Sequence, residues 1–384
     1  MMKYRNPFTR LVSAWVSWLC CILFSCFAFC YLYFYQPEYM AQLQYHFSHG
    51  ETSYQALLGA ALLTLPLSAL GVLFSNLFRW PIRCLAFSWF PSAFLLTALT
   101  SLRMAELPGY QSGTPFVWLT LSVVLFVIVF FLCQAHLDAS GERVSLPSCL
   151  SSNLFILCGL FLMIGGLGYS SASGHRELRV GRLFTEQRYA EVLQSDADTS
   201  CVSHRLFALR VASLAATDSL GYRLFAFHIP AHTSTLLPDQ SDSLFVYDAL
   251  PVLYRWMKAV PLTPCSFSDH VFLRSASRSD SLGVRCVAKD YLLCTYLVRG
   301  EHDAFLREFV SCSDSLRQNP PTHYREALVM FPPSGALQCD SLMRSSYSRF
   351  LCLRKKAQAG DSTSADSLRT YAHTYWAYYH ARFR

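Results

Sequence analysis

Five long apolar segments occupy the first half of this chain of 384 residues. A helix needs about 20 apolar residues to cross the hydrocarbon core of a bilayer, because its backbone groups find no water to bond there. Each segment reaches or approaches this length and contains no Lys, Arg, Asp or Glu. We therefore expect five membrane-spanning helices, at residues 11–35, 55–78, 84–102, 115–133 and 153–169.

Charged residues mark where the apolar half ends. Residues 1–172 contain 12 of the 57 Lys, Arg, Asp and Glu residues, whereas residues 173–384 have the composition of a soluble domain. The sequence thus predicts an all-α protein, in which a five-helix transmembrane bundle at 1–172 is followed by a soluble helical-repeat domain at 173–384. The third segment meets the criteria for a span least well, because it is only about as long as the minimum and contains Pro91, which lacks a backbone N–H.

The positive charges predict the orientation in the membrane, since short loops rich in Lys and Arg stay in the cytoplasm. With five alternating spans, six such residues fall on the side of the N-terminus, and only Arg103 falls on the other. We expect an inner-membrane protein with a cytoplasmic N-terminus and a periplasmic C-terminal domain. Arg176, Arg179 and Arg182 favour the opposite orientation, although charges that begin a long translocated domain weigh less in this rule.

Apolar residues in the soluble half recur at helical spacing. The clearest pair of helices covers 285–298 and 304–312, and Gly300 between them is suited to the left-handed conformation that ends a helix. A second candidate hairpin joins 185–194 to 202–216. This pattern predicts an α-solenoid resembling tetratricopeptide repeats, although their full consensus is absent.

The tripeptide Asp-Ser-Leu occurs six times in the second half of the chain. Asp and Ser are favoured N-caps, because their side-chain oxygens accept hydrogen bonds from the free amides of the first helical turn. If each copy begins a helix, the intervals of 24 to 38 residues have the size of one helical hairpin. Chance repetition in a chain rich in Ser and Leu is the alternative. The copies begin at Asp218, Asp242, Asp280, Asp314, Asp340 and Asp366.

Familiar catalytic and metal-binding motifs are missing from the chain. It has no GxxxxGK[ST] loop, no GxSxG elbow, no HExxH and no CxxC. Pro230 lies between His228 and His232 and breaks the helical spacing that a metal site would need. Charges of both signs alternate in the tail, which argues against nucleic-acid binding. We predict no catalytic residue, no cofactor and no metal.

Four short motifs are spread over nearly the whole chain: GETSY at 50–54 with Leu58 and Gly59, FSWFPS at 87–92, HYREAL at 323–328 and TYWAYY at 374–379. In these motifs and their order the chain resembles an uncharacterised family of polytopic membrane proteins from Bacteroidales, classed as a domain of unknown function. The resemblance implies a membrane bundle followed by a helical-repeat tail. It implies no activity, cofactor or catalytic residue.

These features favour a membrane-anchored interaction or scaffold protein whose helical tail binds an envelope protein or a peptide. The spans carry no charge, the tail is repeat-like, and catalytic motifs are missing. The candidate surface combines the clearest hairpin, the HYREAL motif and the aromatic last helix. Its residues are Tyr291, Arg299, His302, His323, Tyr324, Arg325, Tyr375, Trp376 and Tyr379.

Three alternatives remain open. An envelope enzyme acting on a glycan or lipid would have its site where the membrane helices join the tail, at His175, Arg176, Glu177 and Arg179. A permease subunit is disfavoured, because no ionisable residue interrupts the spans. For the last helix, packing as the cap of the solenoid is an alternative to partner binding, since aromatics lie on all of its sides.

Overall fold

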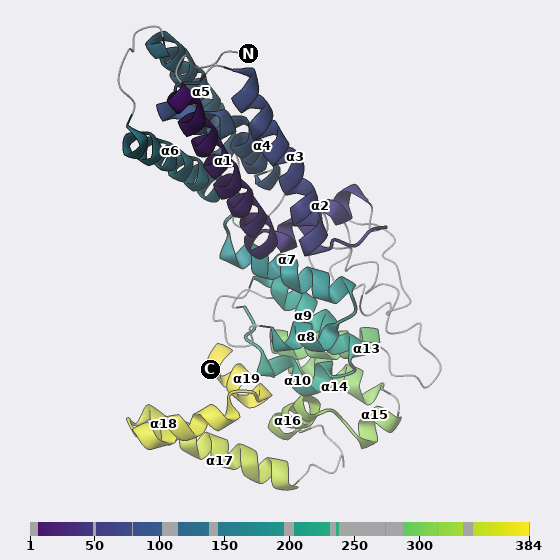
Figure 1. The fold of residues 1–384 in the computed structure, drawn as a ribbon. Coiled ribbons are helices and arrows are strands. Elements are labelled where there is room, and N and C mark those ends of the chain that lie inside the picture. Colours follow the sequence, from purple (N-terminus) through teal and green to yellow (C-terminus); the bar gives the residue numbers. More distant parts are fainter. Residues whose placement is uncertain are drawn as a thin grey trace. The chain divides into compact units, whose positions relative to one another are not determined.

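The computed structural model describes residues 7–48, 51–78, 80–101, 114–137, 145–195, 203–230, 236–237, 273, 287–312, 314–332 and 341–383. These residues form helices and no strand (Figure 1), so the all-α prediction is confirmed for them. The chain divides into two compact units, Met1–Arg179 and Val180–Arg384. The sequence-based boundary at residue 172 coincides with the start of α7 (Ala172–Thr185), a helix that continues past the end of the first unit.

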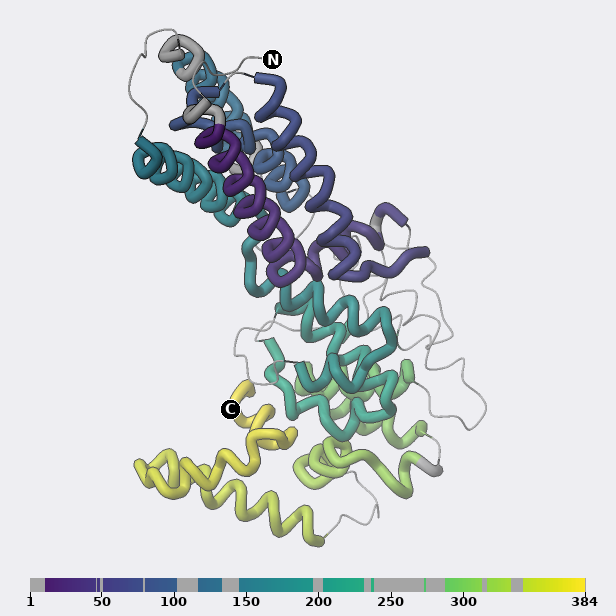
Figure 2. Tube along the Cα trace, viewed as in Figure 1, coloured from purple at the N-terminus to yellow at the C-terminus, as the bar shows by residue number. Residues whose placement is uncertain are grey.

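The first unit consists of apolar helices joined by shorter turns (Figure 2). Its elements before α7 are α1 (Pro7–Cys30), the π-helical turn η1 (Tyr31–Tyr35), α2 (Pro37–Phe47), α3 (Ala56–Leu77), the 3-10 helix η2 (Ile82–Trp89), α4 (Phe90–Thr100), α5 (Thr114–Leu137) and α6 (Leu146–Leu167). Within the described residues, four segments are long and apolar enough to cross a membrane: Leu11–Tyr35, Ala56–Leu77, Ile82–Thr100 and Leu146–Leu167. The span expected at 115–133 lies in α5, whose apolar stretch Val117–Leu132 is shorter.

Residues of the bundle that point inward are spaced about four apart, which places them on one face of each helix. In α1 the buried residues are Val12, Val16, Cys20, Phe24 and Ala28, and Leu32 of η1 continues the series. In α3 they are Ala60, Thr64, Leu67, Gly71 and Ser75. Large apolar side chains such as Trp15, Leu62 and Phe155 are instead exposed. Small inward residues, as in α3, and large apolar residues outside are typical of helices in a bilayer.

The third span is the most enclosed part of this unit. Helices α1, α3, α4 and α6 contact one another in a ring, and η2 contacts α1, α3 and α6. In the most apolar continuous stretch of 18 residues within Ile82–Thr100, 56% of the residues are buried, against 22% to 28% in the corresponding stretches of the other three spans. Gly71 makes room for it, because a Cβ there would lie 2.3 Å from the ring of Trp89. The central position of this segment therefore depends on a glycine of α3.

The same span is irregular, because its first half is a 3-10 helix. Cys84 has non-helical angles, φ −121° and ψ 20°. Pro91 lies in the first turn of α4, where its missing N–H costs no helical bond. Irregular backbone at membrane depth needs polar partners from the protein. Asn153 of α6 supplies them, since its Oδ1 accepts from the N–H of Ala86 at 2.7 Å and its Nδ2 donates to the carbonyl of Ile82 at 2.7 Å.

The second unit is built around one hydrophobic core. Its elements after α7 are α8 (Tyr189–Gln194), α9 (His204–Ala216), α10 (Leu220–Arg223), η3 (Leu224–Ala226), α13 (Val287–Arg299), α14 (His302–Val310), α15 (Asp314–Gln318), α16 (Thr322–Met330), α17 (Ser341–Gln358), α18 (Ser362–Leu368), η5 (Arg369–Tyr371) and α19 (Tyr375–Arg382). The largest core side chains include Phe207, Tyr291, Phe305, Tyr324 and Tyr375, each at most 1% exposed. Helix lengths vary from 4 residues in α10 to 18 in α17, so a regular solenoid stays a prediction.

Helices α13 and α14 form the predicted pair, and Gly300 ends the first of them. Gly300 has φ +73°. Its N–H bonds the carbonyl of Leu297 at 3.2 Å, and the N–H of Glu301 bonds the carbonyl of Tyr296 at 2.9 Å. These two bonds define a Schellman motif. The left-handed conformation predicted for Gly300 is confirmed.

Replacing Gly300 by alanine is expected to lower the free energy of unfolding by about 1–2 kcal/mol, since an L-residue is strained at positive φ. In addition, a Cβ would lie 3.0 Å from the ring of Phe383. The matched control is Gly360→Ala, because Gly360 has φ +98° but no atom within 4 Å of such a Cβ. Thermal unfolding of the purified full chain measures both. A Gly300 variant that unfolds no earlier than the Gly360 variant would show that the contact with Phe383 is unimportant.

The prediction that each Asp-Ser-Leu copy begins a helix is confirmed for the copy at Asp218, where Ser219 directly precedes α10 and Leu220 is its first residue, although the Ser219 side chain makes no capping bond. It is wrong for the copy at Asp366. Asp218 has φ +51° and lies past the end of α9, where the N–H of Ser219 bonds the carbonyl of Leu214 at 2.8 Å. Asp tolerates the left-handed conformation and so replaces the usual glycine there. Asp366 lies inside α18. Asp314 is the first residue of α15, and Asp242, Asp280 and Asp340 lie outside the described residues. Side chains that do cap helices belong to Ser203, Asp361 and Thr374.

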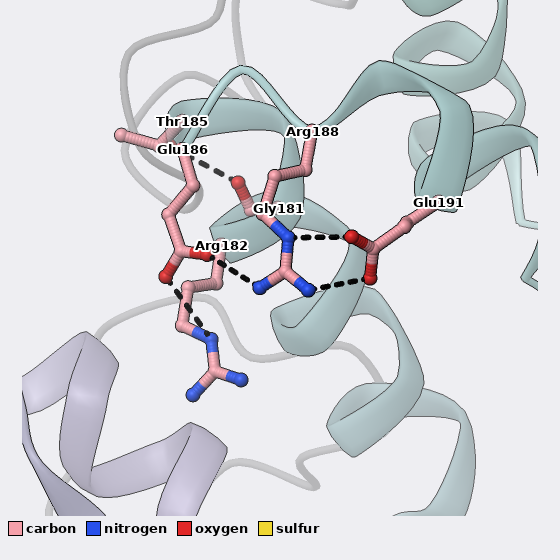
Figure 3. A network of polar contacts seen from close by, with 6 residues as sticks. All are labelled: Gly181, Arg182, Thr185, Glu186, Arg188 and Glu191. Carbon is pink, nitrogen blue, oxygen red and sulfur yellow. Dashed lines mark hydrogen bonds and ion pairs between the residues drawn. The ribbon is translucent and has the colours of Figure 1, made fainter.

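The second predicted hairpin corresponds to α8 and α9, which pack together. A surface network of ion pairs precedes it, at the end of α7 (Figure 3). Arg188 contacts both carboxylate oxygens of Glu191, at 2.7 and 2.6 Å, and one oxygen of Glu186 at 3.1 Å. Arg182 lies 3.7 Å from the other oxygen of Glu186. These side chains are 28% to 49% exposed, so water and salt screen the network and it contributes little stability.

Candidate functional site

Five of the nine residues predicted for the binding surface lie in the interior. Tyr291, His323, Tyr324, Tyr375 and Trp376 are each at most 3% exposed. Burial removes their side chains from any surface that a partner could reach, which corrects the prediction for these five. The sequence shows an aromatic residue but not which neighbour covers it.

Aromatic residues occur on several sides of α19 because two other parts of the unit pack against it. Tyr375 and Tyr378 contact Phe225 of η3, with ring centroids 5.1 and 4.9 Å apart. Trp376 contacts Tyr347 of α17, at a centroid distance of 5.2 Å. The packing alternative for the last helix is therefore the correct one for Tyr375 and Trp376.

Glu326 of α16 holds the start of α19 in place. Its Oε2 accepts from the N–H of Tyr375 at 2.7 Å and lies 2.9 Å from Nδ1 of His323. Because a carboxylate only accepts, Nδ1 of His323 carries the proton. The indole N–H of Trp376 donates to the carbonyl of Glu326 at 3.0 Å. The side chains of His323 and Glu326 are 3% and 5% exposed, so this network is buried and connects α16 to the start of α19.

A second buried polar contact joins α13 to α16. The hydroxyl of Tyr324 donates to Oδ1 of Asp290 at 3.0 Å and lies 3.5 Å from the sulfur of Cys294. Burial, followed by the negative charge of Asp290, raises the pKa of Tyr324 well above its usual range. The phenol thus stays a protonated donor at all ordinary pH values.

Four partly exposed aromatic side chains meet where α14, the end of α16 and α19 come together. We call His302, Phe331, Tyr379 and Phe383 the aromatic surface cluster. His302 stacks on Phe331 with ring centroids 3.6 Å apart, and Tyr379 lies 4.9 Å from His302 and 5.6 Å from Phe331. Phe383 lies 5.3 Å from Tyr379 and is 41% exposed. Two of the predicted surface residues, His302 and Tyr379, therefore lie in one contiguous cluster.

Arginines adjoin the cluster along the chain. Arg299, three residues before His302, is 26% exposed and lies 3.9 Å from Glu301. The guanidinium of Arg382 lies 5.7 Å from the ring centroid of Tyr378. Arg325 on α16 is also partly exposed. Exposed rings with neighbouring arginines suit a ligand that offers an apolar side chain and a carboxylate.

The cluster gives the stability of the protein a pH dependence through His302. Burial lowers the pKa of His302 below 6.5. Between that lowered pKa and 6.5 the unfolded chain binds more protons than the folded one, so stability falls as pH falls through this window and is full above it. We expect thermal unfolding midpoints of the full chain at pH 7.5 and 5.5 to differ less in His302→Phe than in the unchanged chain. An unaltered difference would contradict this role for His302.

The residues proposed for an enzyme site after the last span do not form one exposed charged group. The ring of His175 lies between Tyr35 and Tyr169, at centroid distances of 5.3 and 5.0 Å, and its Nε2 lies 3.3 Å from the carbonyl of Tyr169. Burial lowers the pKa of His175. Glu177 is 3% exposed, whereas Arg179 is exposed. The exposure of Arg176 is intermediate between those of Glu177 and Arg179.

Sequence reasoning did not assign Phe331 and Phe383 to the surface. Each is the first residue after a helix, where the helical stripe no longer determines its direction. The available signal was an aromatic residue directly after a helix with a clear apolar pattern.

In the described part of the chain, no group of three or more His, Cys, Asp or Glu side chains is placed to bind a metal. Comparisons of the chain with protein-family models, curated proteins and solved structures found no match.

Proposed function

We propose that this chain is a membrane-anchored interaction protein whose C-terminal helical unit binds a protein or peptide through the aromatic surface cluster. The carrying observation is the cluster itself, in which four partly exposed rings from three separate chain segments meet. The apolar helices of the first unit supply the anchor. Glu326 and its bonds to Tyr375 and Trp376 fasten α19, so the surface is rigid before a partner arrives.

Interface chemistry supports this assignment. Aromatic residues and arginine are enriched among the residues that carry most of the binding free energy at protein interfaces. Rings with few rotatable bonds lose little entropy when they are covered, and the fixed stack of His302 on Phe331 loses still less. The expected partner presents an apolar side chain next to an acidic residue, such as a helix or an extended peptide of an envelope protein.

The same proposal includes the finer membrane architecture. It has five spans in the inner membrane of a Gram-negative cell, a cytoplasmic N-terminus and a periplasmic solenoid-like tail. Support for the fifth span is the length of α5, whose 24 residues extend about 36 Å, enough to cross a bilayer core. Reporter fusions at Arg79 and Arg384 test this topology, and a cytoplasmic signal at Arg384 would contradict it.

A binding measurement tests the function. The full chain is cross-linked in intact cells and purified through a tag, the captured partner is identified, and its Kd is measured for the unchanged chain and for Phe383→Ala. We expect binding to weaken about 30-fold, as for an interface residue that contributes about 2 kcal/mol. Tyr222→Ala is the matched control, because Tyr222 is 44% exposed on α10, outside the cluster. Equal affinities for both variants would overturn the proposal.

A further inference from the structure

Positive charge is concentrated at the C-terminal end of this chain. The whole chain has a net charge of +7, and residues 341–384 contain eight Lys and Arg but only two Asp, which gives +6. Helix α17 carries five of these cations and no acidic residue. The rest of the protein is therefore almost neutral, and α17 is its main basic element.

One face of α17 packs and the opposite face is basic. The packed face uses Tyr347 and Phe350, which contact Trp376 of α19. At 3.6 residues per turn, the exposed positions from Arg344 to Lys356 fall within one arc of about 140°. These positions are Arg344, Ser345, Ser348, Arg349, Cys352, Lys355 and Lys356. Four of the seven are cations, and the others are small.

The four cations on this face are exposed. Among the described residues, none of Arg344, Arg349, Lys355 and Lys356 has an ion pair. The fifth cation of the helix, Arg354, lies on the packed side. Its guanidinium contacts Nδ1 of His380 at 2.7 Å. Leu342 at the edge of the basic face is 79% exposed. The face therefore offers mobile positive charges and one apolar side chain.

We propose that this basic face of α17 docks on the anionic headgroups of a lipid bilayer. Hot spots of protein interfaces combine arginine with aromatic anchors in buried pockets, and a single-stranded nucleic acid stacks its bases on aromatic rings. The aromatic residues of α17 instead point inward. A flat array of cations matches a surface of lipid phosphates, to which each Lys or Arg contributes about fivefold in binding. Because the same chain carries helices that can span a membrane, the basic face is tethered to a bilayer and meets it at a high effective concentration.

This inference is independent of the aromatic surface cluster and is tested on the full chain in liposomes. A fluorescent amino acid replaces Ser348, in the middle of the face, and lipids with a headgroup quencher report its approach to the bilayer. We expect strong quenching in phosphatidylcholine with 30% phosphatidylglycerol and little in phosphatidylcholine alone. Added salt at 0.5 M should abolish the difference, since it screens the charges.

Two matched double variants identify the residues. Arg344→Gln with Lys355→Gln should reduce the docked-to-undocked ratio about 25-fold, that is, fivefold for each cation. Arg223→Gln with Arg307→Gln, two exposed arginines outside α17, should leave it unchanged. Gln keeps helix propensity, so folding is retained. Equal quenching in both lipid mixtures, no quenching in either, or equal effects of the two double variants would each overturn the proposal.

Discussion

Replacing Asn153 by leucine is expected to lower the free energy of unfolding of the membrane unit by about 2 kcal/mol. Asn153 is 2% exposed, and its amide bonds Ala86, Ile82 and Cys149. Leucine is of similar size but cannot bond the N–H of Ala86 or the carbonyl of Ile82. The 3-10 turn would then hold unsatisfied backbone groups where no water replaces the partner.

Asn76→Leu is the matched control for this prediction. Asn76 lies on α3 and is exposed on the outside of the bundle, so the same substitution removes no buried partner there. Unfolding of the purified full chain by a denaturing detergent, followed by circular dichroism, compares the two variants. If Asn153→Leu is as stable as Asn76→Leu, then the irregular third span does not depend on α6.

Substitution of Glu326 by alanine should destabilise the C-terminal unit by about 3 kcal/mol. The change removes the acceptor for the N–H of Tyr375 and leaves His323 buried with an unpaired Nδ1. Hydrogen bonds to charged groups contribute about 1.5–3 kcal/mol each, and a buried donor without a partner adds its desolvation cost. Amide hydrogen exchange is expected to rise first in α19, because that helix begins at the lost bond.

Glu301→Ala provides the comparison, since the side chain of Glu301 is exposed and among the described residues forms only the ion pair with Arg299, at 3.9 Å. We expect it to change the free energy of unfolding by no more than about 0.5 kcal/mol. Faster exchange spread evenly over the unit after Glu326→Ala, or no change in α19, would contradict the fastening role.

The sequence was sufficient to locate the apolar helices, because the length and hydropathy of a segment are read directly from its residues. Four predicted spans agree with helices whose ends differ by no more than seven residues. The break in the third span was only suspected from Pro91. The polar partner of this irregular backbone is Asn153, 67 residues from Ala86 along the chain, and no local pattern reveals such a partner.

Local chemistry in the tail was predictable where it depended on neighbouring residues and not where it depended on tertiary contacts. Gly300 adopts the left-handed conformation that its place between two helical patterns indicated. Asp218 was considered as an N-cap but has a left-handed conformation after α9, because Asp suits both positions. The composition of α19 left packing and partner binding open, because the residues that cover Tyr375 and Trp376 come from η3 and α17, in distant segments.

The most direct test of the proposed function is photo-cross-linking in intact cells from single positions of the full chain. A photoreactive phenylalanine analogue replaces Phe383 in the aromatic surface cluster or, as control, Tyr222 on α10, which has a similar exposed fraction. We predict one defined protein adduct from position 383 and none from position 222. The same adducts from both positions, or adducts from position 222 alone, would contradict partner binding through the aromatic surface cluster.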